Sequence, residues 1–335
     1  MGEIQKSEKA AKGLGFQTYE EASEQAGRYA SEAISKETKR AYSGDWKRFL
    51  DWCDRVGNRC PIPEAPVPAQ WLAAYYSDMA VSGKKASSIQ RAHVSISFVH
   101  KNYGWADENP CKKAEVLAVL QGIKRELQTR PHKKKALSPE QIREMLETSP
   151  GTAEGVRDKA MLILGILGGL RRSEIAALRV SDIDFTNDGI AVLIRKSKTD
   201  KLGAGHVVGL AKSDNPETCP KEILHAWIKG AARKGEMPLF CSLDRWGNIK
   251  PSTQIRGEVV AKAVKRCAAR IGLDPSIYAG HSLRRGAATA AFQAEVPEKI
   301  VMEKFRWASV SQMRGYVAER DTFDQKFNLT ERMGF

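Results

Sequence analysis

The spacing of apolar residues changes near the middle of the chain. Through the first 130 residues they recur every three or four positions, which predicts helices. We expect helices over 19–33, from Ser35 (a capping residue), after a proline-rich loop at 61–68, from Ser87, and over 114–127. The expected buried positions are Tyr42, Trp46, Phe49, Leu50 and Cys53, then Trp71, Leu72, Tyr75, Tyr76 and Met79, then Ile89, Ala92, Ile96 and Val99. The pattern therefore predicts a flexible tail over 1–17 and an all-α domain over 18–129.

A charged segment with a helix-breaking proline, residues 130–136, is expected to be a linker. Ser138 and Gln141 form a capping box with Pro139 at the first helical position, and an apolar helix follows at 160–167. Alternation with a period of two predicts strands at 190–194 and 206–210, joined by a basic hairpin over 195–201. Helices are expected again from residue 221. The fold class is therefore mainly α with a small β-sheet in a second domain over 137–320, followed by a C-terminal tail over 321–335.

The charge balance adds a polyanionic partner to this picture. The 335 residues carry a formal net charge of +14, and residues 84–135 hold 12 basic against 4 acidic side chains. Nucleic acid fits such a surplus better than an acidic membrane surface, since the longest apolar run, 160–170, is about half a bilayer span and the N-terminus has no apolar signal core. The six cysteines are scattered without a C-x-x-C pair, so neither a zinc site nor a disulfide framework is expected. The expected compartment is reducing and cytoplasmic. No metal and no other cofactor is expected.

Candidate chemistry lies in the second half of the chain. There is no phosphate-binding loop, no H-E-x-x-H and no G-x-S-x-G. What remains are Gly169-Leu170-Arg171-Arg172-Ser173-Glu174, Lys196-Ser197-Lys198-Thr199, Gly280-His281-Ser282-Leu283-Arg284-Arg285-Gly286, Trp307 and Tyr316. Guanidiniums can clamp a phosphodiester, an imidazole can manage a proton, a lysine can protonate a leaving oxygen, and a tyrosine can hold phosphorus as an ester. These are the parts for phosphoryl transfer without a metal.

The spacing of these residues groups them further. Arg171 and Glu174 are three residues apart, as are His281 and Arg284, so each pair can share a helix face and Glu174 can orient Arg171. The same phase predicts that Arg171 and Arg284 point inward in preference to their neighbours Arg172 and Arg285.

Together these motifs resemble the tyrosine recombinases, the phage-integrase superfamily, and most closely its Cre-like members. The resemblance extends over both domains and implies that Arg171, Lys198, His281, Arg284 and Trp307 surround the scissile phosphate, with Tyr316 as nucleophile and Glu174 as supporting acid. Lys198 is preferred over Lys196 and Lys201 because of its place beside Thr199. One departure is Arg306, which precedes Trp307 where many members have a small residue.

The resemblance also implies a site-specific DNA recombinase that integrates or recombines mobile DNA. Its expected steps are a 3′-phosphotyrosine intermediate and a Holliday junction, without metal or ATP. The expected partner is double-stranded DNA with inverted-repeat half-sites, bound by a monomer or dimer that becomes a homo-tetramer on synapsed DNA. The tail over 321–335 would dock into a neighbouring protomer. We expect a nucleoid-associated protein of bacterial, phage or plasmid origin.

DNA contacts are expected on the helix that begins near Ser87. With Ile89, Ala92 and Ile96 inward, Ser87, Gln90 and Arg91 can face outward, and arginine and glutamine make the commonest bidentate base contacts. The remaining expected DNA contacts are Lys84, Lys85, Lys133, Lys134, Lys135 and Arg256.

Two alternative functions remain open. A type IB topoisomerase would use the same chemistry to nick and reseal its own strand. A DNA-binding regulator would have lost catalysis, although all six expected catalytic side chains are present.

Overall fold

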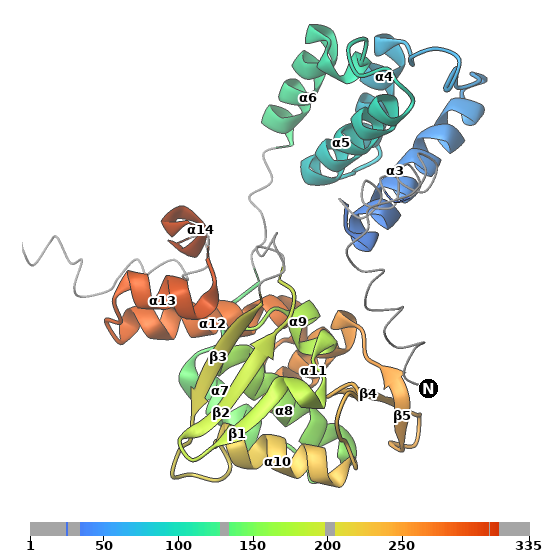
Figure 1. The fold of residues 1–335 in the computed structure, drawn as a ribbon. Coiled ribbons are helices and arrows are strands. Elements are labelled where there is room, and N and C mark those ends of the chain that lie inside the picture. The colour runs from blue at the N-terminus through green and yellow to red at the C-terminus, as the bar shows by residue number, and fades with distance from the viewer. Residues whose placement is uncertain (1–24, 26–33, 128–133, 198–204, 308, 315–335) are drawn as a thin grey trace, which may run out of the picture. The chain divides into compact units, whose positions relative to one another are not determined.

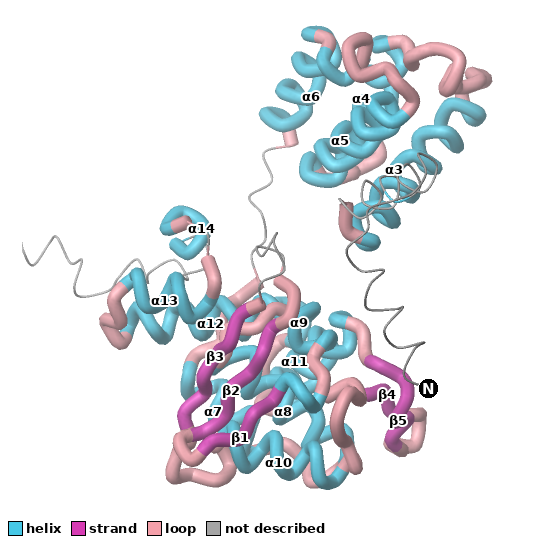
Figure 2. The backbone as a smooth tube through the Cα atoms, in the orientation of Figure 1, coloured by secondary structure: helices cyan, strands magenta, loops and turns pink. Residues whose placement is uncertain are grey.

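The chain divides into two compact units, residues 1–132 and 133–335. The computed structural model describes residues 25, 34–127, 134–197, 205–307 and 309–314 (Figures 1 and 2). The following expected features lie outside the described residues: the tail over 1–17, the helix over 19–33 apart from residue 25, most of the linker, Lys133, Lys198, Tyr316 and the C-terminal tail.

The described part of the first unit is all α-helical, as predicted. Its elements are α3 (Lys36–Arg55), α4 (Ala69–Val81), α5 (Ala86–Asn102), the short 3-10 helix η2 (Pro110–Lys112) and α6 (Ala114–Glu126). Ser35 caps α3 by accepting a hydrogen bond from the Thr38 backbone N–H. The aromatic and aliphatic side chains of α3, α4 and α5 form its core.

One part of the expected stripe on α3 differs. Phe49 and Cys53 are buried, but Tyr42, Trp46 and Leu50 are only half-buried, while Trp52 and Asp45 are buried instead. The buried face is therefore rotated from the expected one. Asp45 on this buried face pairs with Arg91 of α5, and apolar spacing cannot reveal such a pair.

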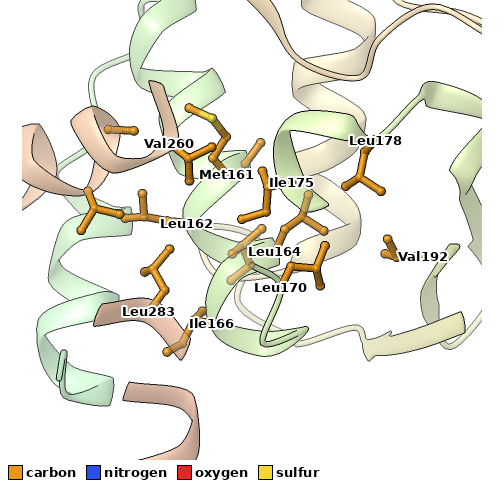
Figure 3. Close-up of a cluster of buried hydrophobic side chains, with 14 of the residues drawn as sticks. Met161, Leu162, Leu164, Ile166, Leu170, Ile175, Leu178, Val192, Val260 and Leu283 are labelled. Atoms are coloured by element: carbon orange, nitrogen blue, oxygen red, sulfur yellow. The ribbon is translucent and has the colours of Figure 1, made fainter. Parts of the chain in front are cut away.

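The second unit is built around α8 (Ala153–Leu167), which is buried over nearly its whole length. The capping box of Ser138 and Gln141 begins α7 (Pro139–Glu147), as expected. The other helices are α9 (Arg172–Ala177), α10 (Pro220–Gly230), α11 (Gly257–Arg270), α12 (Gly280–Gln293), α13 (Glu298–Phe305) and α14 (Val310–Arg314), with 3-10 turns η3 (Val180–Asp182) and η4 (Pro275–Ile277). Side chains of α8, α9, α11 and α12 meet in one hydrophobic cluster (Figure 3).

A three-stranded antiparallel sheet lies beside these helices (Figure 2). Strands β1 (Ile183–Thr186), β2 (Gly189–Ile194) and β3 (His206–Ala211) pair in chain order, with Ile190 opposite Leu210 and Val192 opposite Val208. The pairing of β2 with β3 confirms the two expected strands, while residues 198–201 of the expected basic hairpin lie outside the described part of the chain.

Three strands were not predicted: β1 and the pair β4 (Cys241–Leu243) and β5 (Ile249–Gln254). β1 and β4 have four and three residues, and β5 is exposed along nearly its whole length. Segments that short or that polar show no alternation to recognise. In the described part of the chain, no helix is long and apolar enough to cross a membrane.

Candidate active site

The start of α9 carries the first expected catalytic pair. Arg171 is the N-cap residue of α9, and its backbone N–H donates to Glu174 Oε2 at 2.9 Å. Its Nη1 donates to Glu174 Oε1 at 2.6 Å. The Glu174 side chain is 2% exposed and that of Arg171 is 12% exposed. Glu174 therefore holds Arg171 through both its backbone and its side chain.

Arg284 joins three segments that are far apart in the sequence. It lies in α12, 1% exposed, and its guanidinium donates to the backbone oxygens of Gly169 and Phe305. Its Cζ also lies 4.9 Å from the centroid of the Trp307 ring. This one side chain therefore connects the loop before Arg171 with the end of α13.

Gly169 permits this convergence. Its φ is +55°, and a Cβ added there would lie 2.2 Å from Cδ1 of Phe305. Only glycine combines the left-handed backbone with so close an approach to the Phe305 ring. The expected motif that begins at Gly169 therefore depends on its glycine for packing.

Trp307 and His281 are the other expected members of the site that lie within the described residues. Trp307 is buried, and its ring meets that of Phe305 edge-on with centroids 5.4 Å apart. His281 is exposed in the first turn of α12, the same helix that carries Arg284. The N-terminus of α12 adds partial positive charge at this position. An exposed imidazole on the helix that carries the buried Arg284 guanidinium suits an incoming phosphodiester.

The predicted orientation of the neighbouring arginines is wrong in one case. Arg172 is exposed, as expected, but Arg285 is only 9% exposed. The prediction that Arg285 points outward requires a solvent-facing side of α12, whereas residues 282–288 are all buried. In addition, Arg171 caps α9 and does not lie within it, so its direction follows from the cap and not from helix phase.

Arg306 is a further member of the site whose role could not be assigned from the sequence. Its Nη2 donates to Glu174 Oε2 at 2.7 Å, and its side chain is 7% exposed. Burial lowers the pKa of Arg306, Glu174 opposes that shift, and the charge of Arg171 adds to it. The departure from the family's motif at this position was the available signal.

The charge of this cluster is positive. Arg171 and Arg306 both pair with the carboxylate of Glu174, while Arg284 bonds the backbone oxygens of Gly169 and Phe305. Within the described residues, no three His, Cys, Asp or Glu side chains are grouped so that they could hold a metal ion. The arrangement is able to bind and stabilise an anion with guanidinium hydrogen bonds.

The candidate DNA-contacting residues of the first unit lie at the start of α5. Ser87, Gln90 and Arg91 are exposed, as are Lys84 and Lys85 just before the helix. The Arg91 guanidinium makes two bonds to Asp45, Nε to Oδ2 at 2.8 Å and Nη2 to Oδ1 at 3.0 Å.

The buried side chain of Asp45 holds several of the surrounding side chains in place. It also accepts a hydrogen bond from Ser95 Oγ at 2.9 Å and pairs with Arg48. Burial alone would raise the pKa of Asp45, but its bonds to Arg91, Arg48 and Ser95 hold it below its ordinary value. Asp45 was not expected to be buried, because its partner Arg91 is 46 residues away in the sequence.

The candidate DNA-contacting residues described in the second unit are Lys134, Lys135 and Arg256. Lys134 and Lys135 are exposed, and Lys134 Nζ donates to the backbone oxygen of Ser276 at 2.6 Å. Arg256 is exposed at the N-terminus of α11.

Comparisons with known proteins agree with this architecture. XerH site-specific recombinase, in a post-cleavage complex with palindromic difH substrate, aligns with a TM-score of 0.62 at 17% identity over 88% of this chain and 79% of that one. A λ integrase (75–356) dimer bound to a COC′ core site aligns with a TM-score of 0.59 at 16% identity over 91% and 96% of the two chains. The fold is therefore that of the tyrosine recombinases.

Sequence comparison adds the family. The Phage integrase family model matches residues 135–322. The integrase/recombinase XerD homologue of Selenomonas ruminantium is 31% identical over 298 residues, 88% of this chain and 85% of that protein. Recombinase Cre of Escherichia phage P1 is 25% identical over 308 residues, 87% and 86% of the two chains. The chain belongs to the phage integrase family and is a tyrosine-type site-specific recombinase.

Proposed function

We propose that this recombinase cuts and rejoins duplex DNA through a 3′-phosphotyrosine intermediate. Arg171 and Arg284 bind the non-bridging oxygens of the scissile phosphate, and Trp307 packs against Arg284. The convergence of the three motif segments on the Arg284 guanidinium is the observation that carries this proposal.

The proposed cleavage step exchanges one phosphoester for another. The Tyr316 oxygen forms a bond to phosphorus while its proton passes to His281, and the bond from phosphorus to the 5′ oxygen breaks. Lys198 gives that oxygen a proton, so the products are a 3′-phosphotyrosine and a free 5′-hydroxyl. Attack by the 5′-hydroxyl of a partner duplex reverses these steps and makes a Holliday junction. Because the number of phosphoester bonds is unchanged, no ATP is required.

A nicked suicide substrate tests this step. The nick lets the short 5′-hydroxyl strand diffuse away, so an active enzyme stays covalently bound to DNA. We expect the wild-type protein to be trapped, and Tyr316→Phe to bind the same DNA without an adduct. An adduct with Tyr316→Phe would show that Tyr316 is not the nucleophile. Absence of an adduct with the wild-type protein would favour the alternative of a DNA-binding regulator without catalysis. Joining of strands from two duplexes separates a recombinase from a type IB topoisomerase.

We further propose that α5 contacts DNA in its major groove. Ser87 and Gln90 are exposed there, and Asp45 fixes the Arg91 guanidinium while leaving its side chain 51% exposed. Lys84, Lys85 and the basic residues 133–135 would bind phosphates, which position the protein without reading sequence. Arg256 would add a contact from the second unit. DNA binding of this kind fits a nucleoid-associated protein of bacterial or mobile-element origin.

A groove on the second unit supports the proposed assembly into a tetramer. It has a volume of about 400 Å³ and is lined largely by apolar side chains of α7, α8, α12 and α13, including Ile142, Leu146, Leu167 and Phe305. The C-terminal tail carries matching apolar residues: Phe323, Phe327, Leu329, Met333 and Phe335. We propose that the tail of one protomer occupies this groove on the next, and that four protomers join around synapsed DNA.

A further inference from the structure

Arg306 holds an unusual conformation at the end of α13. Its φ and ψ are 56° and 53°, in the left-handed region that favours glycine. The side chain is nevertheless long, charged and buried, with 7% exposure. An arginine in this backbone conformation and at this depth must gain an interaction that a smaller residue would not provide.

Only part of that interaction is present within the described residues. Nη2 of Arg306 donates to Glu174, whereas Nε and Nη1 are buried with no hydrogen-bond partner there. A buried N–H group without a partner is costly, and more so on a charged group. The guanidinium is therefore incompletely satisfied without a further acceptor.

The surroundings indicate what that acceptor is. Arg306 and Arg171 bind the two oxygens of one carboxylate, so their guanidiniums lie within a few ångströms of each other. Arg284 donates to the backbone oxygen of Phe305, the residue immediately before Arg306. Two guanidiniums thus share the carboxylate of Glu174, and a third, that of Arg284, bonds the residue next to Arg306. The excess positive charge calls for an anion at the same place.

We propose that Arg306 is a third arginine for the scissile phosphate, donating from Nε or Nη1 to a non-bridging oxygen. The proposal rests on the proposed cleavage reaction. Glu174 then has two functions, because it orients Arg171 on one side and Arg306 on the other. The contact would gain strength as negative charge accumulates on the phosphate oxygens in the transition state.

Arg306→Gly is the sharpest variant for a test. Glycine accepts the positive φ without strain, so the backbone at Trp307 is kept while the guanidinium is removed. We expect half-site DNA affinity to change less than about threefold, while the single-turnover rate of covalent cleavage falls by about 10²–10³. Arg306→Lys, which keeps the charge but loses the planar fork, should recover part of that rate.

A methylphosphonate at the scissile position distinguishes a phosphate contact from a structural one. This linkage has no negative charge, so a cation that neutralises the phosphate is no longer needed. On it, Arg306→Gly should fall less than about tenfold below the wild type on the same substrate. Arg270→Ala removes an exposed arginine that bonds the Cys267 sulfur and controls for general charge loss, so it should match the wild type on both substrates.

Each other outcome decides against the proposal. An equal loss on both substrates would show that Arg306 acts only by holding Glu174 and α9 in place. An unchanged rate on ordinary DNA would remove Arg306 from the site. If the wild type binds DNA but forms no adduct, the proposed cleavage reaction is wrong. The Arg306 proposal, which rests on that reaction, is then wrong as well.

Discussion

At the scale of single residues, the site is held by contacts between side chains and backbone. Glu174 binds the Arg171 backbone as well as its guanidinium, and Arg284 binds two backbone oxygens. The pairing of Arg171 with Glu174 could be predicted because the two lie three residues apart. The contacts of Arg284 with Gly169 and Phe305 could not, because they span 115 and 21 residues and leave no periodic pattern.

Gly169→Ala should damage both stability and cleavage. The new Cβ would meet the Phe305 ring and occupy a left-handed backbone position, so α13 or the loop before Arg171 must shift. We expect a loss of about 1–3 kcal/mol in the free energy of unfolding, measured by urea titration, and a slower cleavage rate.

Gly209→Ala in β3 is the matched control, because a Cβ there meets no atom within 4 Å. It should retain wild-type stability and cleavage. Equal behaviour of the two variants would show that the approach of Gly169 to Phe305 does not matter.

At the scale of elements, hydrophobic spacing predicted what is long and amphipathic. It predicted α3 to α6 and the pairing of β2 with β3, and the capping box predicted the start of α7. Of α8, only the second half, 160–167, was predicted, because a helix buried over nearly its whole length has no regular polar face. Hydrophobic spacing failed for β1, β4 and β5, which are short or exposed. It also failed for the rotation of α3, whose buried face includes the charged Asp45, the partner of Arg91. The basic hairpin after β2 is described as far as Ser197. Lys198 lies outside the described residues, so its role stays a prediction.

Lys198→Ala should slow cleavage of ordinary DNA by about 10²–10⁴, because the leaving 5′ oxygen loses its proton donor. A substrate with sulfur at the bridging 5′ position should restore the rate, since a thiolate leaves without a proton. Gel-based single-turnover cleavage measures both.

Lys196→Ala serves as the comparison on the same hairpin, where Lys196 is exposed. It should cleave both substrates at wild-type rates. Sulfur rescue of Lys196→Ala in place of Lys198→Ala would transfer the role of the acid to Lys196.

At the scale of the whole molecule, catalysis is expected to depend on assembly. The apolar groove beside α7 and α8 and the apolar C-terminal residues are complementary in character. If a neighbour's tail occupies the groove, the placement of Tyr316 just before the tail becomes sensitive to the presence of that neighbour.

Deletion of residues 321–335 tests this dependence. Binding to a single half-site should be nearly unchanged, while cooperative binding to a full site and recombination fall steeply. Each buried phenylalanine contributes about 1.5–3 kcal/mol, enough for a few contacts to produce cooperativity. Gel-shift titration on half and full sites measures the difference. Cooperative full-site binding by the truncated protein, or its unfolding, would assign the tail to its own core.

Cleavage by the assembled protein should also proceed in EDTA. The proposed mechanism takes its positive charge from arginines and a lysine, so chelation should leave the rate of adduct formation within about twofold. A rate restored only by added divalent cations would require a metal role that the proposed mechanism lacks.

The contacts of Arg284 have a consequence for judging which relatives are active. Its guanidinium supports the backbone at Gly169 and Phe305, so a descendant that had given up catalysis would still need it in order to fold. His281 is exposed at the helix start, whereas Arg284 is 1% exposed, so a substitution of His281 disturbs less of the packed interior. During evolutionary decay, the histidine should therefore be lost well before the arginine. Among diverged relatives, retention of the histidine is therefore the better indicator that catalytic activity is retained.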